Sequence, residues 1–303
     1  MSYGLWRCDL ISAIIPSYNT AHTIEACLKS VQAQDFGETY ETIVVDSSDD
    51  GSAQMVATKF PGVRLIHLSQ QTPPGEARNI GVRHARGEIL AFIDSDAVAE
   101  PDWLTNIHRV HQSGEDAVGG SIDIANPGSL IAWADYSVIF HGFASNDPKG
   151  YRRACPTCNI SFGRRIFEQY GYFPKIRKVQ DRLFTWTLVK GGERILFDPT
   201  IQVSHIHREK LGRFLHNQYL SGRGFVESRR IAPDLPAAFL LRHHLYLIIP
   251  FVRPVLILKD LLRRNWRLLP KYLLVLPIIA LGQLWYVYGV WDCQHRTPEE
   301  AES

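Results

Sequence analysis

Short apolar runs alternate with segments of helical periodicity in the N-terminal part of this 303-residue chain. The apolar runs fall at residues 11–15, 41–46, 63–68 and 89–93, and the intervening segments place apolar side chains at helical spacing. Strands joined through helices run parallel, because a parallel pair needs a long crossover connection. The sequence therefore predicts an α/β fold with a mostly parallel sheet flanked by helices, and a ligand site at the carboxyl ends of its strands.

Polar residues follow these runs at the sheet edge where a ligand is expected. The first run ends at Pro16, where we expect the strand to break, and a polar loop through Asn19 follows. Asp94 and Asp96 follow the fourth run. Residues two apart on a strand point the same way, so both carboxylates can face one divalent cation. An ordinary polar turn has the same composition, so this pair predicts a metal site only in combination with the neighbouring motifs.

Four segments, taken in order, resemble glycosyltransferase family 2, whose members are inverting, metal-dependent sugar-nucleotide transferases of the GT-A fold. The matching segments are Ile-Ile-Pro-Ser-Tyr-Asn at 14–19, Val-Val-Asp at 44–46, a segment with Gly75, Arg78, Asn79 and Gly81, and Asp-Ser-Asp at 94–96. Each motif is common alone, but their joint order is hard to obtain by chance. The resemblance covers about the first two thirds of the chain and implies a Rossmann-like GT-A sheet.

The resemblance also implies which residues bind the donor: Pro16, Tyr18, Asn19, Asp46, Arg78, Asp94 and Asp96. Asp46 is expected to recognise the nucleoside through its base or ribose. Asp96 is expected to hold Mn²⁺ or Mg²⁺ on the diphosphate, with Asp94 supporting the ribose or the metal, and the cation stabilises charge on the leaving group. Arg78 either lies close to the diphosphate or forms an ion pair with Glu76 or Asp94.

An inverting transferase needs a base that takes the proton of the acceptor. In the family this base is the aspartate of a glutamate-aspartate pair, followed by a helix, a glycine turn and a strand, and Asp181 occupies that position here. Gln180 replaces the glutamate, which removes a negative charge that could tune the pKa of Asp181. The alternative interpretation makes Asp181 an N-cap of the following helix, a role compatible with catalysis.

His205 and His207 fall on one face of a predicted strand at 203–208. Family members often carry a histidine here, which implies that His205 is a third metal ligand or a diphosphate contact. A packed or surface imidazole is the alternative for either residue.

Cys155 and Cys158 form a C-x-x-C motif, which could supply two ligands of a tetrahedral metal site. No second pair exists, so we do not expect zinc or disulfide chemistry, and the five cysteines suit a reducing compartment. The motif lies where the family has small residues before an asparagine that lines the acceptor side, a position matched by Asn159.

The net charge of +2 gives no global footprint for nucleic acid, and none is expected as a partner. Between residues 237 and 271, seven Lys or Arg residues interleave with apolar side chains against one acid, Asp260. This composition is typical of a helix on an anionic membrane surface. Residues 272–290 carry no formal charge and are long enough to cross a bilayer, with a kink expected at Pro277. A re-entrant hairpin and a buried helix docked on the catalytic domain are the alternatives.

The charges flanking residues 272–290 predict their orientation. Cations precede this stretch and acids follow it, so the positive-inside rule places the catalytic domain in the cytoplasm, on the inner membrane if the source is bacterial. Residues 1–10 lack the apolar core of a signal peptide. We expect a catalytic domain at 1–230 and a membrane-association region at 231–303.

These features predict a membrane-associated enzyme that transfers one sugar, with inversion, from a nucleotide sugar to a hydroxyl of a lipid-linked or cell-envelope glycan. A UDP-sugar is the expected donor. Residues 218–224 lack the Q-x-x-R-W motif of the family's processive synthases, which favours one sugar per encounter. The alternatives are a polyprenyl-phosphate sugar transferase and a catalytically silent scaffold that binds nucleotide sugar. A nucleotidyltransferase is a weaker alternative, because the loop at 16–19 lacks a glycine-rich phosphate motif.

Overall fold

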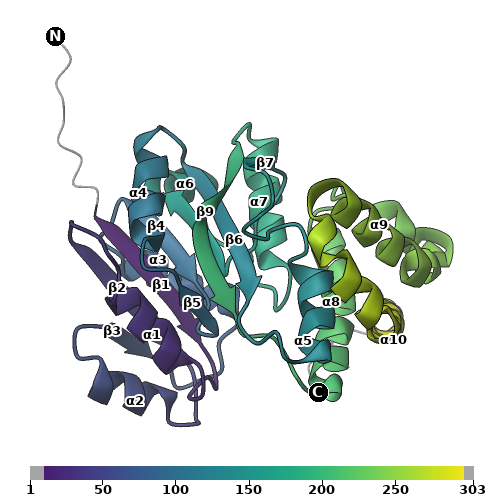
Figure 1. The fold of residues 1–303 in the computed structure, drawn as a ribbon, viewed down its shortest axis with the longest axis horizontal. Coiled ribbons are helices and arrows are strands. Elements are labelled where there is room, and N and C mark those ends of the chain that lie inside the picture. The colour runs from purple at the N-terminus through teal and green to yellow at the C-terminus, as the bar shows by residue number, and fades with distance from the viewer. Residues whose placement is uncertain (1–9, 297–303) are drawn as a thin grey trace.

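The computed structural model describes residues 10–296 and contains a nine-stranded mixed sheet (Figure 1). Its strand order is β3-β2-β1-β4-β8-β6-β9-β5, and β7 pairs with β9. The strands are β1 (Ile11–Ser17), β2 (Tyr40–Asp46), β3 (Arg64–His67), β4 (Ile89–Ile93), β5 (Ala97–Ala99), β6 (Ala117–Ile124), β7 (Gly150–Arg152), β8 (Asn159–Gly163) and β9 (Ile195–His205). The predicted α/β architecture is confirmed.

The first half of the sheet is parallel, as predicted. Strand β1 pairs in parallel with β2 and β4, and β2 pairs in parallel with β3. The expected break at Pro16 is wrong, because β1 continues to Ser17. Pairing with β4 ends at Ile14, so beyond that residue β1 is bonded only to β2. A proline, which lacks a backbone N–H, is tolerated where a strand has a neighbour on one side only.

The second half of the sheet is mixed. Strand β8 runs antiparallel to both β4 and β6, whereas β6 and β9 are parallel. The short strands β5 and β7 both pair antiparallel with β9. In this way β9 extends from the centre of the sheet to β5, which begins directly after the turn that follows β4.

Helices cover both faces of the sheet. They are α1 (Ile24–Gln32), α2 (Ser52–Lys59), α3 (Pro74–His84), α4 (Trp103–Gln112), α5 (Leu130–Ile139), α6 (Arg164–Tyr170) and α7 (Gln180–Lys190). Alternation along β1 divides the core, because Ile11, Ala13 and Ile15 pack toward α1 and α4 whereas Ile14 packs toward α3. The sheet therefore lies between two helical layers, each with its own apolar cluster.

The remaining helices form the end of the molecule opposite β3 (Figure 1). They are α8 (Leu211–Ile231), the 3-10 helix η1 (Ala238–Ile248), α9 (Ile249–Arg264), η2 (Trp266–Leu268) and α10 (Leu269–His295). Helix α10 continues through Pro277. The stretch Trp266–His295 is long enough to cross a membrane and contains an 18-residue window with a mean hydropathy of 1.8.

Helix α10 packs closely on α8. A Cβ at Gly222 of α8 would lie 2.0 Å from the carbonyl oxygen of Tyr286, and one at Gly289 of α10 would lie 2.1 Å from that of Tyr219. The two backbones can approach this closely because glycine has no side chain. Asp292 of α10 is buried and accepts hydrogen bonds from Tyr219 and Arg223 of α8, at 2.7 and 3.1 Å. One face of α10 is thus part of the protein core.

Candidate active site

A cavity of about 930 Å³ opens at the carboxyl ends of β1 and β4 and extends to α8. This is the ligand position expected for an α/β sheet. Most of the predicted site residues line it, namely Pro16, Tyr18, Arg78, Asp94, Asp96, Asp181 and His205. Asn19 and Asp46, which were also predicted, do not line it.

Asp94, Asp96 and His205 converge in this cavity. One ligand atom from each lies within 4.8 Å of the others. The acids come from the turn after β4 rather than from the strand, which ends at Ile93, so strand alternation is not what brings them together. Pairing of β5 with β9 sets Ala97 opposite His205, which carries the imidazole to the turn. Two carboxylates and an imidazole form a donor set suited to a divalent cation.

His205 is buried, and its Nε2 lies 3.2 Å from Oδ1 of Asp96. Burial by itself lowers the pKa of His205, but the charge of Asp96 and the hydrogen bond to it outweigh burial and raise the pKa. The same contact lowers the pKa of Asp96 against the opposing effect of burial. Negative charge at this position, which favours a proton on the imidazole, would equally attract a cation.

A second acid behind His205 was not predicted from the sequence. Asp135 is fully buried in α5, and its Oδ2 lies 3.1 Å from Nδ1 of His207 and 3.0 Å from Nη1 of Arg208. The His207 and His205 rings are 4.7 Å apart. Asp135 therefore holds His207 in place, and His207 in turn packs against His205. An acid in the apolar sequence of α5 was the available signal, because such a residue needs a buried partner.

Arg78 is buried in α3, and its Nη2 donates to Oδ1 of Asp94 at 2.5 Å. The ion pair with Asp94, which was the alternative to a diphosphate contact, is therefore present. Its Nε and Nη1 have no hydrogen-bond partner among the described residues, although the side chain lines the cavity. Buried guanidinium donors without partners favour an anionic ligand beside Asp94.

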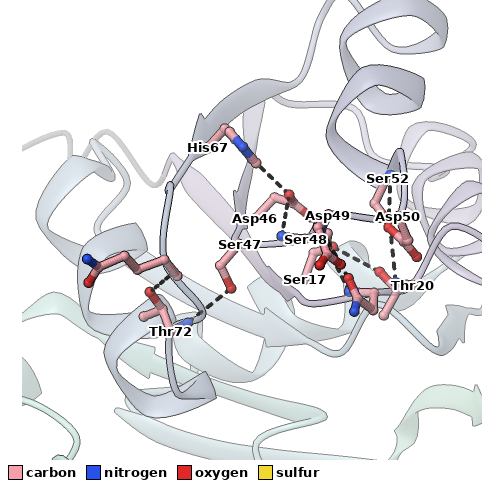
Figure 2. Close-up of polar contacts among 12 residues, drawn as sticks. Ser17, Thr20, Asp46, Ser47, Ser48, Asp49, Asp50, Ser52, His67 and Thr72 are labelled. Atoms are coloured by element: carbon pink, nitrogen blue, oxygen red, sulfur yellow. Dashed lines mark hydrogen bonds and ion pairs between the residues drawn. The ribbon is translucent and has the colours of Figure 1, made fainter.

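The carboxylate of Asp46 is buried in a hydrogen-bond network between two loops (Figure 2). It accepts hydrogen bonds from the hydroxyls of Ser17 and Ser48, at 2.6 and 2.7 Å, and lies 3.0 Å from Nδ1 of His67. Asn19 joins the same loops, since its N–H donates to Ser48. These contacts tie the loop after β1, which borders the cavity, to the loop after β2, while direct recognition of a nucleoside by Asp46 stays a prediction.

Asp181 lies in the first turn of α7 and lines the cavity. The predicted N-cap role is wrong, because the N-cap residue is Val179, in a left-handed conformation with φ 58°. Asp181 instead accepts a hydrogen bond from the N–H of Arg182 at 2.8 Å. A β-branched residue at positive φ is strained, and such strain is found at functional sites.

The expectation that Asn159 lines the acceptor side is wrong. Asn159 is fully buried, accepts a hydrogen bond from the Trp103 indole and donates to the carbonyls of Ser121 and Ile201. It closes the irregular pairing of β6 with β9, where the register shifts between Gly120 and Ser121. Thr157 and Cys158 border the cavity instead.

The fold and this site define a glycosyltransferase of the GT-A type. Residues 12–171 match glycosyl transferase family 2, so the chain belongs to that family and is a nucleotide-sugar-dependent glycosyltransferase. The mannosyltransferase PcManGT from Pyrobaculum calidifontis, solved with GDP-Man and Mn²⁺, has a similar fold, with a TM-score of 0.63 at 20% identity over 93% of this chain and 87% of that one.

Three relatives from different organisms match in sequence. Glycosyltransferase AglE of Haloferax volcanii is 28% identical over 72% of this chain and 73% of its own length. Succinoglycan biosynthesis protein ExoO of Rhizobium meliloti is 37% identical over 69% of this chain and 64% of its own. The Escherichia coli protein WfgD, a UDP-Glc:alpha-D-GlcNAc-diphosphoundecaprenol beta-1,3-glucosyltransferase, is 30% identical over 40% of this chain and 49% of its own.

Proposed function

We propose that the enzyme transfers one sugar, with inversion, from a UDP-sugar to a hydroxyl of a lipid-linked or cell-envelope glycan. The observation that carries this proposal is the convergence of Asp94, Asp96 and His205 in the cavity that Asp181 also lines. A site for the leaving diphosphate and a base for the acceptor share one space, as an inverting transfer requires.

Asp94, Asp96 and His205 would hold Mn²⁺ or Mg²⁺. Their donor chemistry and the partnerless guanidinium nitrogens of Arg78 fit a metal-bound diphosphate. When bound, the cation offsets negative charge on the departing nucleotide diphosphate. Arg78 would add hydrogen bonds to the same oxygens from its Nε and Nη1.

Asp181 would take the proton of the acceptor hydroxyl on its carboxylate. It lies in the first turn of α7, where the partial positive charge of a helix N-terminus suits a carboxylate side chain. Gln180, which replaces the family glutamate, is buried and packs against the position of Gly75. Gln180 would position Asp181 without adding a negative charge beside it.

The donor would lie over the loops that the Asp46 network fixes. Pro16 and Tyr18 border the cavity there and would contact the nucleoside, whereas Asn19 and Asp46 would act by holding the loop conformation. A role of Asp46 in direct contact with base or ribose would require its carboxylate to exchange a present partner for the ligand.

The C-terminal region, residues 231–303, would associate with a membrane while the catalytic part, residues 1–230, faces the cytoplasm. Phe251 and Trp266 are 76% and 68% exposed, and Arg263, Arg264 and Arg267 lie near them in the chain. Apolar side chains beside cations suit an anionic lipid surface. Because one face of α10 packs on the polar helix α8, we favour an arrangement in which α9 and α10 lie in the membrane surface over a full crossing.

Nucleotide binding tests the proposed function. We would measure equilibrium binding of UDP, GDP, dTDP and CDP to the full chain in detergent, with and without Mn²⁺. UDP should bind in a Mn²⁺-dependent way, and Asp96→Asn should abolish the dependence. Asp102→Asn removes an acid outside this cavity and should bind as the unaltered protein does. Absence of binding of every nucleotide to folded protein would overturn the proposal.

A further inference from the structure

We propose that the part of the cavity bordered by Arg177, Lys178 and Arg213 binds a second diphosphate, carried by the acceptor. The three cations come from the loop before α7 and from the first turn of α8. This inference rests on the proposed function and names its acceptor class, a sugar linked through a diphosphate to a lipid.

The charges that line the cavity are unequally paired. Asp94 is paired with Arg78, and Arg208 is paired with the buried Asp135. Within residues 10–296, the side chains of Arg177 and Arg213 form no ion pair. A nucleotide sugar carries one negative charge on each of its two phosphates, and a divalent cation would neutralise both. The donor and its cation together therefore add no net negative charge to balance Arg177, Lys178 and Arg213, which share the cavity with the carboxylate of Asp181.

Lys178 has the strongest need for an anion. Its Nζ donates to Oδ1 of Asn217 at 2.7 Å, a neutral acceptor, and no carboxylate pairs with it among the described residues. Burial lowers the pKa of Lys178 to about 8. A partly buried ammonium without a carboxylate is costly, and a phosphate oxygen would compensate for its lost hydration.

The loop that carries Arg177 and Lys178 is held in place. A Cβ at Gly224 of α8 would lie 2.8 Å from the Cβ of Lys178, so glycine allows the loop to pack on the helix. Val179 then adopts its left-handed conformation, and Asp181 follows two residues later. The anion site and the proposed base are therefore set by the same packing.

Helix α8 connects this site to the apolar end of the molecule. One face of the helix borders the cavity through Arg213, His216, Asn217, Leu220 and Ser221. The other face packs on α10, where Gly222 and Phe214 meet Tyr286 and Gly282. A lipid attached to a diphosphate at Arg213 could therefore follow α8 toward α9 and α10. The cavity volume lies near the upper end of the range for ligand sites, which leaves room for an acceptor beside a nucleotide.

Geranyl diphosphate is a suitable probe, because it has the diphosphate and a short prenyl chain but no nucleoside. We would titrate it into the full chain in detergent with UDP and Mn²⁺ at saturation, and titrate inorganic pyrophosphate in parallel. Both probes should bind beside UDP, and geranyl diphosphate should bind more tightly. Arg177→Gln and Arg213→Gln should each weaken probe binding roughly ten-fold, the value of one charged hydrogen bond, with UDP affinity unchanged.

Lys175→Gln is the matched control, because Lys175 is an exposed cation of the same loop outside the cavity. It should bind the probes as the unaltered protein does. Probe binding that UDP and Mn²⁺ abolish, or that Arg177→Gln and Arg213→Gln leave intact, would overturn the inference and leave the proposed function standing. Equal affinity for pyrophosphate and geranyl diphosphate would overturn the lipid-linked source. Loss of UDP binding would instead count against the proposed function.

Discussion

The sheet and the C-terminal helices hold similar apolar side chains but cover them to different extents. Every residue of β1 is buried, because helices pack on both faces of the sheet. Helix α9, by contrast, leaves Phe251, Val255 and Leu262 more than half exposed, although Ile257 and Leu261 on its other face are buried. Among residues 10–296 both faces of the sheet are covered by helices, whereas the helical end has an apolar surface that no described residue covers.

In the proposed function, the two ends of the molecule contribute to different steps. The carboxylates that would perform the reaction lie beside the sheet, Asp94 and Asp96 in the turn after β4 and Asp181 in the first turn of α7. The helical end contributes cations and apolar side chains, which suit the holding of an acceptor rather than its reaction. Substitutions at the two ends should therefore change different measured quantities.

Asp181→Asn is expected to have the largest effect. Loss of a general base lowers kcat by about 10²–10⁴-fold. Membrane partition and binding of UDP with Mn²⁺ should not change, so the effect would be confined to the sheet. Turnover with a nucleotide sugar and an acceptor extract measures it, with Asp102→Asn as the control. Persistence of activity would point to a phosphate acceptor, which needs less help from a base.

Gly289→Leu tests whether α10 is part of the core. The new side chain would meet the backbone of Tyr219, and overpacking of this kind costs about 1–3 kcal/mol. The melting temperature of the full chain in detergent should fall by several degrees. Ala280→Leu adds the same side chain on an exposed position of α10 and should leave it unchanged. Equal melting of both variants would mean that α10 is not docked on α8.

Phe251→Ser tests the uncovered surface. Removing a phenylalanine that enters a lipid surface costs about 1.5–3 kcal/mol, so binding to vesicles containing phosphatidylglycerol should weaken by roughly ten- to a hundred-fold. Tyr172→Ser removes a similarly large exposed ring from the catalytic part and should not alter partition. If Phe251→Ser bound vesicles normally, the two ends would not differ as proposed.

The smallest expected effect is a pH dependence through Lys178. Burial and the charges of Arg208 and Arg177 lower its pKa to about 8, against the opposing charges of Asp135 and Asp181. Affinity for geranyl diphosphate should therefore fall as pH rises through about 8. The free energy of unfolding should instead rise between about pH 8 and 10.5. In this range Lys178 of the folded protein has lost its proton, whereas the same group in the unfolded chain, with its ordinary pKa of 10.5, still holds one, so the cost of burying the charge is removed. Lys178→Met should remove both trends.

Much of the sheet and the two acids of the Asp94, Asp96 and His205 cluster could be predicted from the sequence, because both are encoded locally. Strands β1 to β4 follow from continuous apolar runs, and Asp94 and Asp96 lie in one short motif. His205 is remote in the chain, but it follows a strand pattern and resembles a family position. The family assignment followed from the order of these motifs and is confirmed.

The parts that escaped prediction depend on contacts between remote segments. The burial of Asn159 follows from how β6 pairs with β9, and the Asp135 cluster follows from where α5 meets the end of β9. Val179, rather than Asp181, caps α7 because the loop before it packs on Gly224. Periodicity and motif spacing carry no information about such packing.

The close contact of α10 with α8 has a practical consequence for anyone who shortens this chain. A cut after Arg230 follows the predicted boundary between the catalytic and C-terminal regions and is the obvious way to remove the apolar helices. It would also strip the cover from Phe214 and Phe225 of α8 and from Val138 of α5, all of which now pack on later residues. The fragment would expose an apolar surface beside its own active site. An assay of it could then not distinguish aggregation from loss of acceptor binding.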